Sequence, residues 1–250
     1  MTPALRTEGL SKSWGGFVAN SQISLSLATG ARHALIGPNG AGKSTFINLL
    51  TGVISPSAGD VYLNGVRITH LPPHERVKRG MARTFQITTL FPGLTVLESV
   101  MLAICERRGV AKAWHCTVAS RKTEIDEAWA LLASLHLEKD ANRLTRALPY
   151  GRQRLVEIAL ALAVRPKLLL LDEPAAGIHA GESAEIFDVI ARLPSDVTIL
   201  FIEHDMDLVF RFAQRITVLV GGKLLCEGTP AEIAADKRVR EVYLGEVQYA

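Results

Sequence analysis

One segment of the sequence combines glycines, a lysine and two hydroxyl groups in a spacing suited to holding a polyphosphate. It reads Gly37-Pro38-Asn39-Gly40-Ala41-Gly42-Lys43-Ser44-Thr45, a complete G-x-x-x-x-G-K-S pattern. The glycines permit a tight loop whose backbone N–H groups point inward, and a following helix adds the positive end of its dipole. We expect Lys43 to reach the β- and γ-phosphates of a nucleotide and Ser44 to bind Mg²⁺.

A second segment supplies the carboxylates that such a loop requires. Asp172 and Glu173 follow four consecutive leucines at residues 168–171, which indicate a buried strand. We expect Asp172 to bind Mg²⁺ and Glu173 to polarise the attacking water. An ordinary polar strand end is the alternative interpretation, and the phosphate loop favours the catalytic one. The sequence has no Asn-Lys-x-Asp segment, which disfavours a small GTPase.

The hydrophobic pattern indicates which elements position these residues. Residues 22–27 alternate as in a half-buried strand, residues 33–36 form an apolar strand before the loop, and a helix is expected from Lys43 onward. Buried parallel strands are expected at the apolar runs of residues 168–171, 197–202 and 216–220.

The middle of the chain has a different pattern. Residues 92–148 carry apolar side chains at helical spacing, among them Val96, Val100 and Leu132, and this predicts a helical insertion. The insertion also accounts for the long separation of Lys43 from Asp172, which exceeds that of neighbouring βαβ units. Residues 227–246 predict a turn followed by a short helical tail.

Composition excludes several classes of protein. The chain has 250 residues, 48% hydrophobic and 21% charged, which is typical of a folded globular chain and excludes general disorder. The net charge of +3 is too balanced to indicate a polyanion partner. Three cysteines without C-x-x-C spacing indicate free thiols in a reducing compartment. We find no membrane-spanning run and no signal peptide, so the chain is expected to be cytosolic unless a partner holds it at a membrane.

An ordered series of motifs resembles one family along essentially the whole chain. The series comprises Trp14, the phosphate loop, Gln86 within RTFQ, residues 148–153 (LPYGRQ), residues 171–174 (LDEP) and His204. In this series the chain resembles an ATPase subunit of an ABC transporter. The segments LFPGLTVLESV, EPAAGI and the ending EGTPAEI…EVYLGE are most similar to the ATPases of branched-chain amino acid importers.

The resemblance implies an α/β fold with ATP and Mg²⁺ as ligands. The family has a P-loop NTPase core with a mostly parallel sheet, an antiparallel β portion near the amino terminus and an α-helical subdomain. Carried onto this chain, residues 1–250 form a single ABC ATP-binding domain. Its core would comprise residues 1–88 and 155–250, and its helical subdomain residues 89–154.

The resemblance also assigns roles to three side chains outside the two chemical segments. Trp14 corresponds to the aromatic residue that stacks on adenine, and a tryptophan packed near the amino terminus is the alternative. Gln86 corresponds to a residue that contacts Mg²⁺ and the attacking water. His204 corresponds to the residue that contacts the γ-phosphate and orients Glu173.

The signature segment, Leu148-Pro149-Tyr150-Gly151-Arg152, departs from the family pattern. In the family this segment contacts the γ-phosphate bound to the opposite subunit, commonly through a serine hydroxyl, and Pro149 stands at the serine position. The positive end of the following helix and the Gly151 N–H remain. We therefore hypothesise that hydrolysis at the site completed by this segment is weakened rather than abolished. His179 similarly replaces a common aspartate, so it is given no dimer-contact role.

The resemblance implies several partners. Residues 86–101 would receive a cytoplasmic helix of integral-membrane permease subunits, and a second ABC ATPase subunit, identical or related, would complete the ATP sites. A periplasmic or extracellular solute-binding protein would take part indirectly, and the chain would lie peripherally at the cytoplasmic face of the inner membrane. No nucleic acid is expected, because the basic stretches at residues 74–83 and 107–122 resemble a solvated face.

Two other functions are compatible with the same motifs. An ATPase of a lipopolysaccharide-type exporter resembles this chain at its ending but lacks the RTFQ-type segment. A soluble ABC ATPase acting on DNA or ribosomes is disfavoured, because the chain has neither a long coiled-coil insertion nor a second cassette.

Overall fold

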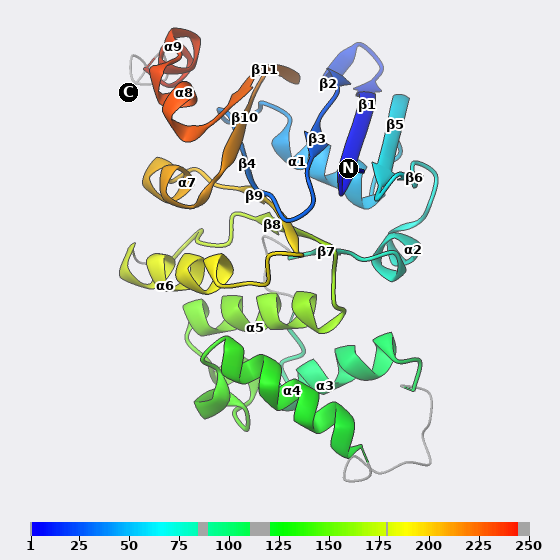
Figure 1. Ribbon diagram of the computed structural model, residues 1–250, viewed down its shortest axis with the longest axis vertical. Coiled ribbons are helices and arrows are strands. Elements are labelled where there is room, and N and C mark those ends of the chain that lie inside the picture. The colour runs from blue at the N-terminus through cyan, green and yellow to red at the C-terminus, as the bar shows by residue number, and fades with distance from the viewer. Residues whose placement is uncertain (1, 85–89, 111–120, 179, 245–250) are drawn as a thin grey trace.

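The computed structural model describes residues 2–84, 90–110, 121–178 and 180–244 of the 250-residue chain. Within these residues the structure has two sheets and a helical region, which lie in distinct parts of the molecule (Figure 1). The α/β class and the helical insertion predicted from the sequence are both confirmed.

The larger sheet carries the strands that precede the chemical segments. Its strand order is β11-β10-β4-β9-β8-β7, and every neighbouring pair from β10 to β7 is parallel, whereas β11 is antiparallel to β10. In chain order the strands are β4 (Arg32–Ile36), β7 (Met81–Arg83), β8 (Leu168–Asp172), β9 (Thr198–Ile202), β10 (Arg215–Val220) and β11 (Lys223–Gly228). The parallel strands expected at residues 168–171, 197–202 and 216–220 are therefore confirmed.

The second sheet is antiparallel and lies near the amino terminus. It is built from β1 (Leu5–Trp14), β2 (Phe17–Ile23), β3 (Ser26–Leu27), β5 (Ala58–Leu63) and β6 (Val66–Arg67). The strand predicted at residues 22–27 is divided between β2 and β3. The division falls at residues 24–25, where Leu25 N–H donates to Thr7 Oγ1 instead of a ladder partner. Gln22, just before it within β2, has a positive φ of 51°.

Alternation along the parallel strands creates two hydrophobic clusters, one on each face of the larger sheet. Leu169 and Leu171 of β8 face the cluster that contains the helical region, while Leu168 and Leu170 face the cluster shared with the antiparallel sheet. Both faces are covered, which explains why these strands are apolar at every position.

The helical region lies at one end of the molecule, opposite the antiparallel strands (Figure 1). It consists of α3 (Val96–Arg107), α4 (Lys122–Ser134), the short 3₁₀ helices η2 (Glu138–Asp140) and η3 (Thr145–Ala147), and α5 (Tyr150–Ala163). Thr95 caps α3 in a reciprocal capping box with Glu98. The subdomain boundary predicted between residues 154 and 155 falls inside α5, which continues without interruption from the helical region to the sheet.

The remaining helices pack around the two sheets. They are α1 (Lys43–Thr51), α2 (Pro73–Lys78), α6 (Ala180–Ala191), α7 (Met206–Phe212), α8 (Pro230–Ala235) and α9 (Lys237–Leu244). Helix α1 begins at Lys43 as expected, and α8 and α9 form the predicted helical tail. Over the described ranges, no helix combines the length and apolarity needed to cross a bilayer.

Candidate active site

The phosphate loop connects β4 to α1, and close backbone contacts determine its shape. Gly42 has a φ of 94°, and a Cβ atom there would lie 2.4 Å from the carbonyl oxygen of Ala19. At Gly37 a Cβ atom would lie 2.1 Å from the carbonyl oxygen of Leu219. Neither position can accept a larger residue without displacing backbone, which is the physical reason for glycine at both ends of the loop.

Lys43 is buried and lies across the loop. Its ammonium group donates to the carbonyl oxygens of Gly37, at 2.6 Å, and Pro38, at 3.0 Å. The first helical hydrogen bond of α1 runs from Phe46 N–H to Gly42 C=O at 2.9 Å. The loop therefore already holds a positive charge and a helix amino terminus together, in an arrangement suited to an anion.

A cavity of about 380 Å³ opens over this loop and brings distant parts of the chain together. Loop residues from Asn39 to Thr45 form one wall, and Glu173 and His204 also line it. The structure thus places two of the predicted catalytic side chains, Glu173 after β8 and His204 after β9, beside the phosphate loop. The cavity is also lined by Phe17, Val18, Ala19, Gly221 and Gly222.

Glu173 and His204 contact each other directly in this cavity. The Nε2–H of His204 donates to Glu173 Oε1 at 2.9 Å, because a carboxylate oxygen can only accept. Glu173 has a φ of 49°, which is rare for a residue with a side chain and costs about 1–3 kcal/mol. Its N–H donates to Ile202 C=O at 3.0 Å, which ties this strained residue to the end of β9.

Glu203 is a supporting residue that the sequence analysis did not identify. Its buried carboxylate accepts hydrogen bonds from Ala175 N–H, at 3.0 Å, and His204 N–H, at 3.1 Å. Burial raises the pKa of Glu203 above its ordinary value, and the backbone N–H donors oppose this shift. Glu203 thereby joins the segments that carry Glu173 and His204. The sequence feature that could have identified Glu203 is its place directly after the apolar strand β9.

Asp172 is buried at the end of β8. Its Oδ2 accepts from Arg83 Nη2 at 2.7 Å, and Arg83 Nη1 donates to Asn48 Oδ1 at 2.6 Å. Asp172 and Ser44 offer a carboxylate and a hydroxyl, which are the oxygen donors that Mg²⁺ prefers. Among the described residues no group of three or more histidine, cysteine or acidic side chains is arranged to hold a metal ion by itself. The Asp172 and Ser44 oxygens fit a Mg²⁺ that takes further oxygen ligands from phosphates and water.

The aromatic residue beside the cavity differs from the one identified in the sequence. Trp14 ends β1 with 49% of its surface exposed, and Lys12 Nζ lies 5.1 Å from its ring centroid. Phe17, the cross-strand partner of Trp14, lines the cavity, whereas Trp14 is not among the lining residues. Adenine stacking by Trp14 stays a prediction, and Phe17 is a second aromatic candidate.

The signature segment lies outside this cavity. Helix α5 begins at Tyr150, and Pro149 occupies the N-cap position with no side-chain cap. Gly151 is buried, and the guanidinium of Arg152 is directed to the Asp140 carboxylate, with Nε 2.8 Å from Oδ2. None of the signature residues lines the phosphate-loop cavity of the same chain.

A groove and a larger cavity lie between the sheet and the helical region. The groove, about 210 Å³, is lined mainly by apolar side chains, including Ala82, Leu90 and Leu160. It shares Val77 and Val164 with a neighbouring cavity of about 840 Å³.

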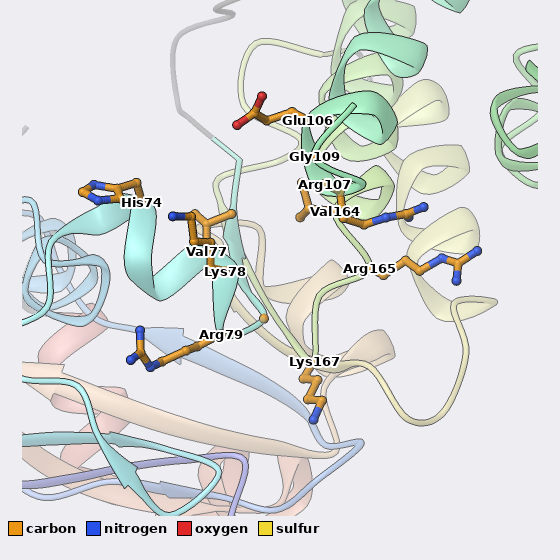
Figure 2. A pocket seen from close by; sticks show the side chains of 11 residues that line it. His74, Val77, Lys78, Arg79, Glu106, Arg107, Gly109, Val164, Arg165 and Lys167 are labelled. Atoms are coloured by element: carbon orange, nitrogen blue, oxygen red, sulfur yellow. The ribbon is translucent and has the colours of Figure 1, made fainter. Parts of the chain in front are cut away.

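The larger cavity is lined by basic residues from both stretches singled out in the sequence, and by Arg165 and Lys167 as well. In Figure 2 the charged ends of Lys78 and Arg79 lie on the α2 side of the cavity. Those of Arg107 and Arg165 lie on the opposite side, so the two pairs are directed away from each other. Each pair also shares an acidic partner, Glu75 or Glu127, at 2.7 to 3.1 Å. These cations surround the cavity without converging on one anion.

Gln86, predicted to contact Mg²⁺ and the attacking water, and His179, to which no role was assigned, lie outside the described residues.

Comparisons with known proteins agree with this geometry. Residues 20–176 match the model of the ABC transporter family, and residues 223–248 match that of the branched-chain amino acid ATP-binding cassette transporter. The chain is 39% identical to the high-affinity branched-chain amino acid transport ATP-binding protein LivG of Salmonella typhimurium, over 98% of both chains.

Solved structures of ATP-binding cassettes share the fold. The ADP conformation of the cassette MJ1267 superposes with a TM-score of 0.86 at 33% identity, covering 98% of this chain and all of that one (100%). The dimeric post-hydrolysis state of the cassette MJ0796, bound to ADP and Pi, gives a TM-score of 0.76 at 26% identity, covering 90% and 98% of the two chains.

Proposed function

The chain belongs to the ABC transporter family of ATP-binding proteins, and from that premise we propose that it binds and hydrolyses ATP to power the import of branched-chain amino acids. The observation that carries this proposal is the cavity in which the phosphate loop, Glu173 and His204 meet. The full-length similarity to branched-chain amino acid transport proteins supports the choice of solute.

The phosphate loop performs the binding step. The backbone N–H groups of residues 37–45 and the amino end of α1 hold the phosphates, and the Lys43 ammonium exchanges its loop carbonyls for phosphate oxygens. Because the loop is held by backbone contacts at Gly37 and Gly42, little reorganisation is needed when the nucleotide enters.

Ser44 and Asp172 would hold Mg²⁺, and Gln86 is the third residue proposed to contact it. When bound, the metal neutralises charge on the β- and γ-phosphate oxygens. Asp172 is suited to this role because its carboxylate is oriented by a hydrogen bond from Arg83.

Glu173 and His204 act on the water and the γ-phosphate. The Glu173 carboxylate accepts a hydrogen bond from the attacking water and polarises it, while His204 holds that carboxylate through Nε2. The backbone of Glu173 is anchored to Ile202, so the carboxylate is held at the end of the sheet. His204, 45% exposed at its side chain, is accessible to a γ-phosphate in the same cavity.

A second ATPase subunit completes the site. The signature residues do not line the phosphate-loop cavity of their own chain, which supports a head-to-tail arrangement in which Gly151 and the amino end of α5 face the nucleotide of the partner. Binding of ATP then closes the pair and hydrolysis opens it. Pro149 supplies no hydroxyl, so this half of the composite site makes one hydrogen bond fewer than the family pattern.

The apolar groove between β7 and α5 is the proposed docking place of a permease helix. Leu90 lines it, and Thr84 presents a buried hydroxyl that has no hydrogen-bond partner within the described part of the chain. Phe91, which follows Leu90 in the chain, is 53% exposed. Docking there would hold the chain at the cytoplasmic face of the inner membrane.

The test is to purify the tagged chain from gently solubilised membranes of its source and to identify its partners by mass spectrometry. We expect two multi-spanning permeases and a second ATPase, and the reconstituted complex should take up leucine only with ATP. A complex containing Glu173→Gln is the matched control and should not transport. Recovery of single-span export components, or of ribosomes or DNA without membrane proteins, would contradict the importer assignment while leaving ATP hydrolysis intact.

A further inference from the structure

Arg83 joins the two elements that carry the predicted metal ligands. It ends β7, and its guanidinium donates through Nη2 to Asp172 Oδ2 at 2.7 Å and through Nη1 to Asn48 Oδ1 at 2.6 Å. Asp172 ends β8, and Asn48 belongs to α1. One planar group therefore spans the gap between the strand of one ligand and the helix of the other.

The position of Asn48 on α1 makes this link relevant to Ser44. Residues four apart on a helix lie on the same face, so Asn48 is one turn beyond the Ser44 hydroxyl. On the other side, β7 pairs with β8 in parallel, and Thr84 N–H donates to Leu170 C=O at 3.0 Å. Arg83 is thus held in place by the pairing of β7 with β8, and its side chain can fix the position of α1 relative to Asp172.

The two oxygens of Asp172 have different surroundings. Oδ2 is engaged by Arg83, whereas Oδ1 makes no hydrogen bond to any described residue. The pair is nearly enclosed, with side-chain exposures of 13% for Arg83 and 5% for Asp172. A buried ion pair is weak evidence of a purely stabilising role, because desolvation offsets its attraction. An arrangement that orients one oxygen and leaves the other for a ligand is typical of support around a metal site.

We propose that Arg83 is a positioning residue for Mg²⁺: it holds Asp172 by Oδ2, leaves Oδ1 for the metal and sets the separation of Asp172 from Ser44. This inference rests on the proposed nucleotide function of the same site. The positive charge of Arg83 has an opposite effect, since it repels a cation. If orientation dominates, removal of Arg83 weakens metal binding, and if charge dominates, removal strengthens it.

The experiment measures Mn²⁺ binding to the full chain in complex with a non-hydrolysable ATP analogue, by electron paramagnetic resonance. We expect Arg83→Met to weaken Mn²⁺ binding about 10–100-fold. Arg83→Lys should weaken it as well, because one ammonium cannot bridge Asp172 and Asn48 in the same geometry. Affinity for the analogue without metal should change less than about 2-fold.

Two further variants separate this role from general stability. Asn48→Ala removes only the α1 end of the link and should give a smaller loss of Mn²⁺ affinity than Arg83→Met. Arg211→Met removes an exposed ion pair on α7, with Asp188, and should leave Mn²⁺ affinity unchanged. If Arg83→Met does not fold, as judged by thermal unfolding, Arg83→Lys and Asn48→Ala carry the test.

Unchanged or tighter Mn²⁺ binding in the Arg83 variants that fold would overturn the inference. The ion pair would then only stabilise the fold, or would compete with the metal for Asp172. Equal weakening in Arg211→Met would overturn it too. A wild-type chain that binds no analogue at all would instead overturn the proposed function, and this inference with it.

Discussion

The phosphate-loop face and the signature face are built in different ways, although both are proposed to contact ATP. The loop face is held by contacts within its own chain. Lys43 donates to two carbonyls of its own loop, and the glycines are packed against neighbouring backbone. The signature face is the open end of a helix, where Pro149 provides no cap. The loop face is thus held within one chain, whereas the signature face leaves helix N–H donors that the proposed partner's nucleotide would use.

The two faces also differ in what holds them. Glu173 and His204 are tied to the ends of central strands through Ile202 and Glu203. The start of α5 is held through Arg152 and Asp140 within the helical region. Changes at the loop face should therefore alter chemistry directly, and changes at the signature face should act through helix position.

The largest effect should come from Glu173→Gln. The amide keeps the size of the side chain but cannot polarise water, so ATP hydrolysis should fall about 10²–10⁴-fold while nucleotide binding is retained. Steady-state phosphate release and equilibrium nucleotide binding measure the two properties. Glu138→Gln, an exposed change in η2, is the control and should leave both unchanged. Hydrolysis at the wild-type rate would show that Glu173 is not the water-polarising group.

Lys43→Ala should rank second. Loss of the buried ammonium removes a charged donor from the phosphates and leaves the carbonyls of Gly37 and Pro38 without it, so hydrolysis should fall about 10²–10³-fold. In contrast to Glu173→Gln, nucleotide affinity should fall too, as titration calorimetry would measure. Exposed Lys223→Ala should behave like the wild type. Undiminished nucleotide affinity in Lys43→Ala would remove the main difference between the two faces.

Arg152→Ala should lower the free energy of unfolding, because Arg152 holds the start of α5 at the signature face. It removes charged hydrogen bonds to Asp140 and the contact with the His136 carbonyl, although Arg143 still pairs with Asp140. We expect the free energy of unfolding to fall by about 1.5–3 kcal/mol, measured by urea denaturation. Arg146→Ala, an exposed change nearby, is the control. A loss no greater than that of the control would mean that Arg152 is not the anchor of α5.

Pro149→Ser should give the smallest effect, and in the opposite direction. A serine can cap α5, which contributes about 0.5–2 kcal/mol, and its hydroxyl can contact the partner's γ-phosphate. Turnover in the reconstituted complex should rise by up to about tenfold, since about 1.4 kcal/mol corresponds to a factor of ten. Pro149→Ala, which removes the proline ring but adds no hydroxyl, is the control and should not raise turnover. If turnover does not rise in Pro149→Ser, the weakened-signature hypothesis is wrong.

Local pattern predicted much of the site. The loop at residues 37–45 and the strands that lead to Asp172 and His204 were identified because strand, turn and helix signals coincide within a few residues. The division of the strand predicted at residues 22–27 was missed, because the hydrogen bond from Leu25 N–H to Thr7 Oγ1 that accompanies it depends on a neighbouring strand. The position of Phe17 at the cavity and the hydrogen bonds of Glu203 were missed, because both arise from packing across elements.

The sequence by itself determined the α/β class, the phosphate loop and the order of the chemical groups, since each depends on residues adjacent in the chain. Only the tertiary structure decided which groups meet. The whole helical region lies between Arg83 and Asp172 in the chain, yet parallel pairing of β7 with β8 brings Arg83 Nη2 to 2.7 Å from Asp172 Oδ2. Helix packing likewise brings Arg152 to Asp140 and places Lys78 and Arg107 around one cavity. Such contacts follow from strand order and helix packing, which periodicity along one segment does not specify.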